Sequence, residues 1–281
     1  MAYTAEISRT NPSCFLFLID QSGSMAEPFA GQPDTKKSHE VAAAINRLLQ
    51  TLVLRCAKGH EVLDRFHVGV IGYGSGSIGP ALGGQLTGQI LVPISQLAMF
   101  PLRVEQRTKR VPDGAGGLVE QTVKFPIWFE PVANGKTPMC AALDLAWNSL
   151  TEFLTRYPGC YPPIVINITD GRASDGNPAP HAQCVQDLAS RDGNVLLFNV
   201  HLSARPENPI ELPDQEAVLP DDHAKLLFRM SSELPPQMRE TAQREGYRVS
   251  EHARGFVFNG DMVAVIRFLD IGTRVDMRNM R

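Results

Sequence analysis

Hydroxyl and carboxylate side chains are concentrated where an apolar run near the N-terminus ends. Residues 15–19, FLFLI, lead directly into Asp20, which is followed by Ser22 and Ser24 with Gly23 between them. A turn needs only one polar side chain of this kind, so three oxygen donors within five residues suggest a shared ligand. Gly23 allows the backbone to bend tightly enough for the two serine hydroxyls to converge.

Two further oxygen donors occur at comparable places later in the chain. Asp170 follows the apolar run at 163–169, and Thr137 stands in the motif NGKTPM where an amphipathic segment begins. In doubly wound sheets, ligands bind beyond the carboxyl ends of the strands. We therefore expect one crevice to be lined by five side chains, those of Asp20, Ser22, Ser24, Thr137 and Asp170.

Each of these residues also has an ordinary structural interpretation. Either aspartate could be a turn residue at a strand end, in particular Asp170 before Gly171. Thr137 could be the N-cap of a helix, and the serines could be plain loop hydroxyls. Short motifs are weak indicators when they stand alone. The coincidence of all five at three loops on one edge favours a common site.

The chemistry of the donor set predicts a hard divalent cation. Oxygen ligands without His or Cys favour Mg²⁺, or alternatively Mn²⁺ or Ca²⁺, over zinc. Hydroxyls are neutral, so coordination by Ser22, Ser24 and Thr137 would leave the charge of the ion largely uncompensated. If Asp20 and Asp170 act through water molecules, a vacant position on the ion would attract a carboxylate from outside.

The elements that must position these residues alternate between strand and helix. Apolar runs predict buried strands, and apolar residues at helical spacing predict amphipathic helices. The strands are expected at 15–19, 65–73, 163–171, 194–202 and 255–259, and the helices at 41–56, 139–154 and 261–270. This alternation predicts an α/β fold with a doubly wound, mainly parallel sheet and helices on both faces.

One long insertion interrupts the alternation at residues 74–134. Its start, GSGSIG, fits the GxGxxG pattern but runs into no helix, so we interpret it as a flexible link. Its later part, 103–129, predicts a β-hairpin that turns at residues 112–117. The hairpin carries four basic residues and could contact a partner or form a solvated edge ribbon; these residues are Arg103, Arg107, Lys109 and Arg110.

The remainder of the chain suggests one domain over residues 1–273. The proline-rich, acidic segment at 204–222 is expected to be a surface loop, and the last residues, 274–281, form a basic tail. The net charge of −3 argues against a nucleic-acid partner, which would require a strongly basic surface. The apolar runs are shorter than the ~20 residues of a membrane helix, so no membrane partner is expected.

The cysteines and the first residues indicate the compartment. Five scattered cysteines without a CxxC pair fit reduced thiols better than a disulfide framework. The first residues, MAYTAEISRTNPS, lack the basic and apolar regions of a signal peptide. A cytoplasmic protein is therefore expected.

The motifs together resemble those of a known family. DQSGS at 20–24 matches the DxSxS signature of the von Willebrand factor type A domain. Thr137 and Asp170 match the threonine and aspartate that complete the metal-ion-dependent adhesion site of that family. The resemblance covers residues from about 13 to 271, with the insertion at 74–134 as the main departure. It implies a Rossmann-like fold.

The resemblance also implies roles for the site residues. Ser22, Ser24 and Thr137 would form the inner shell of the metal, with Asp20 and Asp170 mainly water-mediated. A Glu or Asp of a partner protein would take the sixth position. The chain looks most like compact bacterial single-domain versions similar to tellurite-resistance TerY proteins, and this likeness places it beside kinases, phosphatases or AAA+ ATPases.

These observations lead to a functional hypothesis and one alternative. The hypothesis is a non-enzymatic, metal-dependent protein–protein interaction module in a bacterial signalling, stress-response or defence complex. The alternative is a Mg²⁺-dependent phosphohydrolase. An aspartate-nucleophile phosphatase would normally carry a second acid two residues after Asp20, where this chain has Ser22.

Overall fold

A central eight-stranded sheet organises the molecule in the computed structural model. The structure describes residues 3–29, 32–74, 77–112, 117–203, 208–260 and 267. In sheet order the strands are β15 (Ile210–Glu211), β16 (Phe256–Phe258), β14 (Leu196–His201), β11 (Ile164–Thr169), β1 (Ser13–Gln21), β6 (Phe66–Gly74) and β7 (Ser77–Pro80), and β8 (Val92–Pro93) also pairs with β6. The five central strands β16, β14, β11, β1 and β6 are parallel, whereas β15, β7 and β8 pair antiparallel at the edges.

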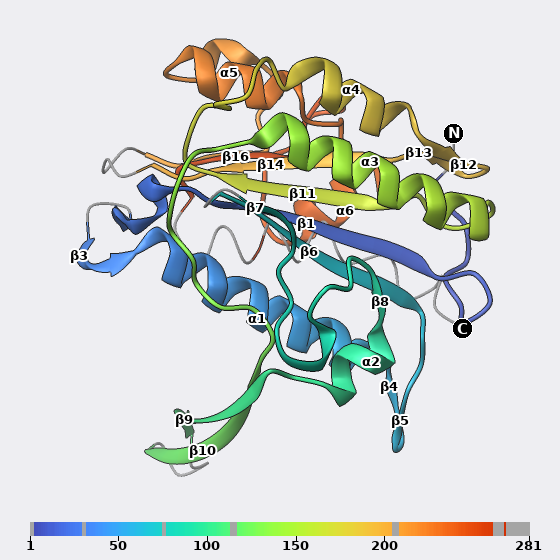
Figure 1. Ribbon diagram of the computed structural model, residues 1–281, viewed down its shortest axis with the longest axis vertical. Coiled ribbons are helices and arrows are strands. Elements are labelled where there is room, and N and C mark those ends of the chain that lie inside the picture. The colour runs from blue at the N-terminus through green and yellow to red at the C-terminus, as the bar shows by residue number, and fades with distance from the viewer. Residues whose placement is uncertain are drawn as a thin grey trace.

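Helices cover both faces of this sheet (Figure 1). On one face lie α1 (Lys37–Cys56), α2 (Ile94–Met99) and α6 (Pro236–Arg244), and on the other lie α3 (Met139–Arg156), α4 (Ala179–Asp187) and α5 (Asp222–Arg229). The predicted α/β class with a mainly parallel sheet between two helical layers is confirmed.

Strand β1 shows why both faces must be covered. Successive side chains of a strand point to opposite faces. Phe15 and Phe17 therefore join the core beneath α1, and Leu16 and Leu18 join the core beneath α3. All four are fully buried. A strand that is apolar on both sides reads as an unbroken hydrophobic run, and this pattern made it recognisable in the sequence.

Short elements complete the structure. Within the described residues, 3₁₀ turns lie at η1 (Gly23–Ala26), η2 (Gly84–Leu86) and η3 (Glu216–Val218). Two-stranded ribbons in the same part of the chain pair β2 (Pro28–Phe29) with β3 (Gln32–Lys36), β4 (Ala57–Lys58) with β5 (Glu61–Val62), β9 (Arg103–Pro112) with β10 (Leu118–Ile127), and β12 (Ala189–Ser190) with β13 (Gly193–Asn194).

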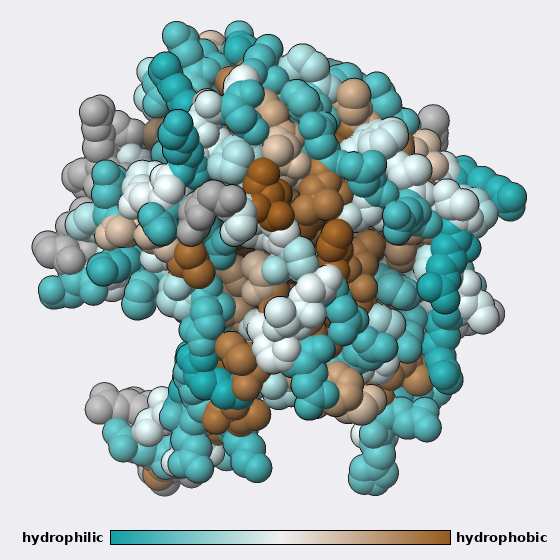
Figure 2. All heavy atoms as spheres, viewed as in Figure 1, coloured by the Kyte–Doolittle hydropathy of each residue, from teal (hydrophilic) through white to brown (hydrophobic). Residues whose placement is uncertain are grey.

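The ribbon of β9 and β10 projects from the body of the molecule, at the lower left of Figure 1. Its ten-residue strands pair antiparallel; Arg103 lies opposite Ile127 at one end and Pro112 opposite Leu118 at the other. The hairpin predicted at 103–129 is therefore confirmed; residues 113–116 of its turn lie outside the described part of the chain. Figure 2 shows a recess between the hairpin and the body.

Two predictions for irregular segments were wrong. The start of the insertion is not simply a link, because Ser77–Pro80 form strand β7, which continues the sheet beyond β6. Within the expected loop at 204–222, Ile210–Glu211 form strand β15 and pair with β16. Both strands are short and lie at the sheet edges, where pairing gives little sequence pattern.

Other predictions fall on residues outside the described part. The helix expected at 261–270 is described only at Arg267, and the basic tail at 274–281 is not described. Of the five cysteines, Cys14, Cys56, Cys140 and Cys160 are buried free thiols, and Cys184 is exposed and also free. No helix in the described residues combines the length and apolar character required to cross a lipid bilayer.

Candidate functional site

The end of β1 places Asp20 in the interior at the carboxyl edge of the sheet. The side chain of Asp20 is fully buried, and its Oδ1 accepts a hydrogen bond from the backbone N–H of Ser22 at 2.9 Å. The chain then turns into η1, where the hydroxyls of Ser22 and Ser24 share a hydrogen bond of 3.1 Å. The three oxygen donors of the first motif therefore converge.

Strand β11 brings the second carboxylate to the same place. Because β1 and β11 run parallel with Ile19 opposite Ile168, both strands end at one edge. The hydroxyl of Ser24 donates to Asp170 Oδ1 at 2.7 Å. Asp20, Ser22, Ser24 and Asp170 thus form one continuous hydrogen-bonded group.

Thr137 faces this group from the loop before α3. A Cβ atom placed on Gly171 would lie 3.6 Å from Thr137 Oγ1 and 4.0 Å from Ser24 Oγ, so both hydroxyls border the same point. The backbone N–H of Gly23 donates to the carbonyl of Gly135 at 3.0 Å, which ties this loop to η1. The structure therefore brings all five predicted residues to one edge of the sheet.

The capping interpretation of Thr137 is wrong. Pro138 is the N-cap residue of α3, and no side chain at that position accepts a capping hydrogen bond. Instead, Asp175 accepts hydrogen bonds from the backbone N–H groups of Cys140 at 3.2 Å and Ala141 at 3.0 Å. Among the described residues, the Thr137 hydroxyl makes no hydrogen bond.

Two neighbours of the predicted residues were missed in the sequence. The hydroxyl of Thr169 donates to Asp20 Oδ2 at 2.6 Å, and both side chains are fully buried. Ser174 holds the loop of Thr137, because its hydroxyl accepts from the Thr137 N–H at 3.1 Å and its N–H donates to the Thr137 carbonyl at 2.8 Å. A strand-end threonine gives no signal of this role before its partner is known.

A buried lysine is the third residue that was missed. Lys37 begins α1, and its Nζ lies 2.7 Å from Asp170 Oδ2 and 3.0 Å from Glu27 Oε2. The side chain of Lys37 is 3% exposed, that of Asp170 is 0% exposed and that of Glu27 is 55% exposed. Because unpaired charges are costly to bury, the ammonium and Asp170 stabilise each other.

One donor distance is compatible with a small divalent cation. Two adjacent ligands of an octahedral Mg²⁺, each at about 2.1 Å, would be separated by about 3.0 Å. The hydroxyls of Ser22 and Ser24 stand 3.1 Å apart, close to that separation. In the described residues, no cluster of three or more His, Cys, Asp or Glu side chains could hold a metal. A cation here would rely on hydroxyl ligands.

Burial sets the electrostatics of the site. Desolvation raises the pKa of Asp20 above its ordinary value, although the hydrogen bonds from Thr169 and Ser22 act in the opposite direction. Desolvation also raises the pKa of Tyr73 well above its usual value; the Tyr73 hydroxyl donates to Asn167 at 2.7 Å. A cation beside Asp20 would favour its ionised form, which burial disfavours.

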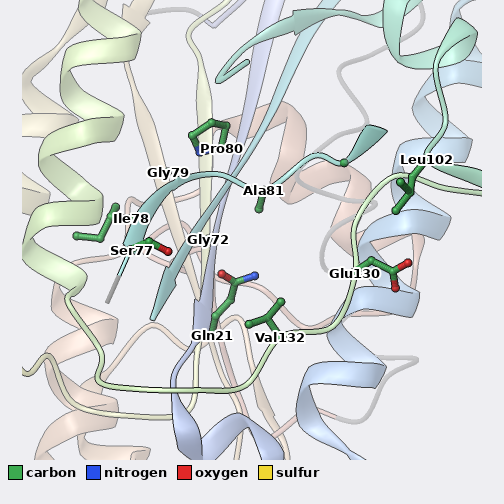
Figure 3. Close-up of a pocket in the computed structure, with 11 residues that line it drawn as sticks. Gln21, Gly72, Ser77, Ile78, Gly79, Pro80, Ala81, Leu102, Glu130 and Val132 are labelled. Atoms are coloured by element: carbon green, nitrogen blue, oxygen red, sulfur yellow. The ribbon is translucent and has the colours of Figure 1, made fainter. Parts of the chain in front are cut away.

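A pocket of about 400 Å³ lies beside the site (Figure 3). The amide of Gln21 lies over Gly72, where a Cβ atom would approach Gln21 Oε1 to 2.2 Å, so only glycine permits this packing. Leu102 and Glu130, at the two ends of the hairpin, also line the pocket, and Glu130 forms an ion pair with Arg103. The backbone N–H of Asn134 donates to the Gln21 carbonyl at 2.7 Å. The base of the hairpin is therefore physically continuous with the loops of the candidate site.

Comparisons with known proteins give structural similarities only. No protein-family model matches the sequence. A search of curated proteins likewise finds no match.

Solved structures of pilus proteins are among the structural matches. The pilus adhesin SpaC from Lactobacillus rhamnosus GG is 14% identical with a TM-score of 0.48, over 96% of this chain and 32% of that one. The PilB minor pilin from Streptococcus sanguinis is 10% identical with a TM-score of 0.48, over 95% of this chain and 61% of that one. The vWF domain of the type V pili tip protein Mfa5 from Porphyromonas gingivalis is 13% identical with a TM-score of 0.34, over 58% of this chain and 39% of that one.

This chain therefore spans about a third of the SpaC chain and less than two thirds of the other two. Similarities of this strength assign neither a ligand nor an activity to the protein.

Proposed function

We propose that this protein is a metal-dependent protein-interaction module in which a divalent cation at the carboxyl edge of the sheet binds a carboxylate of a partner protein. The observation that carries the proposal is the hydrogen-bonded group of Asp20, Ser22, Ser24 and Asp170. The hydroxyl of Thr137, which makes no hydrogen bond in the part of the chain that the structure describes, faces this group. This group combines neutral donors with two carboxylates and has no His or Cys among its members.

Each residue contributes differently to holding the ion. Ser22, Ser24 and Thr137 would be neutral inner ligands, and Mg²⁺ is the expected ion because it accepts oxygen donors in octahedral geometry. Asp20 and Asp170 would retain it from farther out while their own hydrogen bonds keep the serines in place. A bound divalent ion supplies a vacant coordination position and a positive charge for an acidic side chain.

The hairpin of β9 and β10 is a second contact surface in this proposal. Val104 and Val119 are 52% and 48% exposed there, and an isolated two-stranded ribbon is only marginally stable in water. Arg107 lies 3.7 Å above the ring of Phe125 and pairs with Glu105, so part of the basic charge is already balanced. Exposed apolar side chains on a projecting ribbon favour a protein partner over a purely solvated role.

Metal binding can be tested directly by calorimetry and thermal unfolding. A ligand present at one hundred times its dissociation constant stabilises the fold by about 2.7 kcal/mol, which corresponds to about 5 °C in Tm for a chain of this size. We expect Mg²⁺ or Mn²⁺ to produce such a shift in the native protein and in the exposed control Asp144→Asn, but not in Asp20→Asn or Thr137→Ala. Equal shifts in all four proteins would contradict the site.

Partner binding requires a second experiment. The immobilised chain is exposed to lysate of the source cell with Mg²⁺ or with a chelator, and the bound proteins are identified by mass spectrometry. We expect capture of a kinase, phosphatase or AAA+ ATPase type of partner only with metal, lost in Asp20→Asn and weakened in Val104→Ser. If the same proteins are captured in the presence of the chelator and by Asp20→Asn, the proposed interaction module is refuted. Turnover of a phosphate ester that is lost in Asp20→Asn would instead favour the phosphohydrolase.

A further inference from the structure

The candidate site already contains a positive charge that the motif does not include. The Lys37 ammonium lies 2.7 Å from Asp170 Oδ2, and the other oxygen of the same carboxylate accepts a hydrogen bond from Ser24 at 2.7 Å. Ser24 is one of the hydroxyls placed to bind a metal. Lys37 and a metal bound at Ser24 would thus both act on the same buried carboxylate.

The position of Lys37 is unusual for this residue type. Lysine is almost never fully buried unless it is paired, and here the side chain is only 3% exposed. The lysine backbone is also held, because its N–H donates to the Glu27 carbonyl at 3.1 Å, and the Glu27 N–H donates to the Ser24 carbonyl at 3.0 Å. Loop and helix therefore fix Lys37 and Glu27 next to the serine motif.

Glu27 offers the ammonium a second partner at the rim of the site. Its carboxylate lies 3.0 Å from Lys37 Nζ and is 55% exposed, whereas the side chain of Asp170 is fully buried. The ammonium bridges an inner and an outer carboxylate. It can pair more closely with the outer one without losing all of its electrostatic compensation.

We propose that Lys37 is an internal counter-cation of Asp170 that competes with the divalent ion, so that metal loading shifts the ammonium toward Glu27. This inference rests on the proposed function and specifies how the same site is regulated. Without a metal, Lys37 compensates the buried charge of Asp170. With a metal, two cations would act on one carboxylate, and their repulsion lowers the affinity for the metal.

The expected effect is large enough to measure. At low salt and with the dielectric constant of water, a unit charge on the order of 6 Å from a divalent ion changes its binding constant by roughly tenfold. Any lower effective dielectric constant in the buried site increases this factor. Removal of the Lys37 charge should therefore tighten metal binding by about tenfold or more.

Titration calorimetry of the full chain with Mg²⁺ and with Mn²⁺ tests the competition. Lys37→Met should bind at least about tenfold more tightly than the native protein, whereas the control Lys37→Arg, which keeps the charge, should stay within about threefold. An unchanged or weaker affinity in Lys37→Met would overturn the proposal. Glu27→Gln should weaken metal binding more in the native protein than in Lys37→Met. Equal effects in both backgrounds would show that the Lys37 ammonium does not shift toward Glu27 and would also overturn the proposal.

Lys37→Met leaves Asp170 as a buried, unpaired charge and can therefore destabilise the chain. Thermal unfolding at increasing metal concentration tests the proposal in that case. Lys37→Met should then recover stability with added metal, with a larger rise in Tm than the native protein. If the Tm of Lys37→Met lies below that of the native protein by the same amount at every metal concentration, the counter-cation role is refuted. If the native protein binds metal and Lys37→Met binds it equally, only this inference fails. If neither binds metal, the proposed function fails as well.

Discussion

The hydrogen bond between Thr169 and Asp20 offers the sharpest test of the electrostatics of the site. Thr169→Val keeps the shape and the branched Cβ of the side chain but removes the hydroxyl. That hydroxyl donates to Asp20 Oδ2 at 2.6 Å and accepts from the Gly171 N–H at 3.1 Å. The valine leaves a buried carboxylate oxygen without this donor, and it also removes the partner of the Gly171 N–H.

The magnitude follows from the chemistry of the acceptor. A hydrogen bond to a charged group contributes about 1.5–3 kcal/mol, and both side chains are fully buried, so water cannot replace it. We expect Thr169→Val to lower the free energy of unfolding by about 2–3 kcal/mol. For a chain of this size this lowers Tm by about 4–5 °C.

Urea and thermal unfolding followed by circular dichroism provide the assay, in metal-free buffer at neutral pH. Thr151→Val is the matched control, because the Thr151 hydroxyl donates to the Trp147 carbonyl at 2.8 Å on the exposed side of α3. The control should change stability by less than about 0.5 kcal/mol. Equal stabilities of the two variants would show that Asp20 does not depend on Thr169, and the electrostatic reasoning would fail.

Two further predictions concern residues outside the site. Asn46 Oδ1 accepts from the N–H groups of Trp128 at 2.7 Å and Phe129 at 3.1 Å, so Asn46→Leu should cost about 3 kcal/mol in urea unfolding; a loss below 1 kcal/mol would contradict this. Burial, followed by the nearby His223, lowers the pKa of His201 to about 4. Between these pH values the unfolded chain therefore binds a proton that the folded chain does not, and the free energy of unfolding should fall by about 3 kcal/mol as the pH drops from about 6.5 to 4. His201→Phe should make the free energy of unfolding less dependent on pH in this range. Parallel pH profiles of the native protein and His201→Phe would refute the prediction.

The long buried elements were predictable because their sequence pattern is strong. Residues 15–19 are apolar on both faces, and Val41, Ile45, Leu48 and Leu52 recur at helical spacing, so β1 and α1 were recognisable without a structure. The helices α2, α4, α5 and α6 were missed. They contain only six to nine residues each, and such short helices are stabilised by tertiary packing more than by their own sequence.

The candidate site was predictable only in part, for a related reason. Asp20, Ser22 and Ser24 lie within five residues, and strand ends position Asp170, so the topology of a parallel sheet brings them together. Lys37 is separated from the motif in the sequence by β2, β3 and the end of η1, and its sequence context indicates only an ordinary polar residue at the start of a helix. Its burial depends on the path of the chain through β2 and β3, which pair antiparallel and return it to the site. Such long-range closure leaves no local signal.

The charges of the assembled site determine how it would treat an acidic partner. Among the described groups that bond to one another in the site, the carboxylates of Asp20, Asp170 and Glu27 stand beside the ammonium of Lys37. With all four ionised, these groups carry a net negative charge, and the exposed Glu27 would repel an approaching carboxylate. A divalent cation would neutralise this charge, so the repulsion would end at the moment when a coordination position becomes available. Capture of an acidic partner should then follow the fraction of sites that hold metal. Capture that persists after a chelator has removed the metal would require another source of binding energy, such as the exposed hairpin.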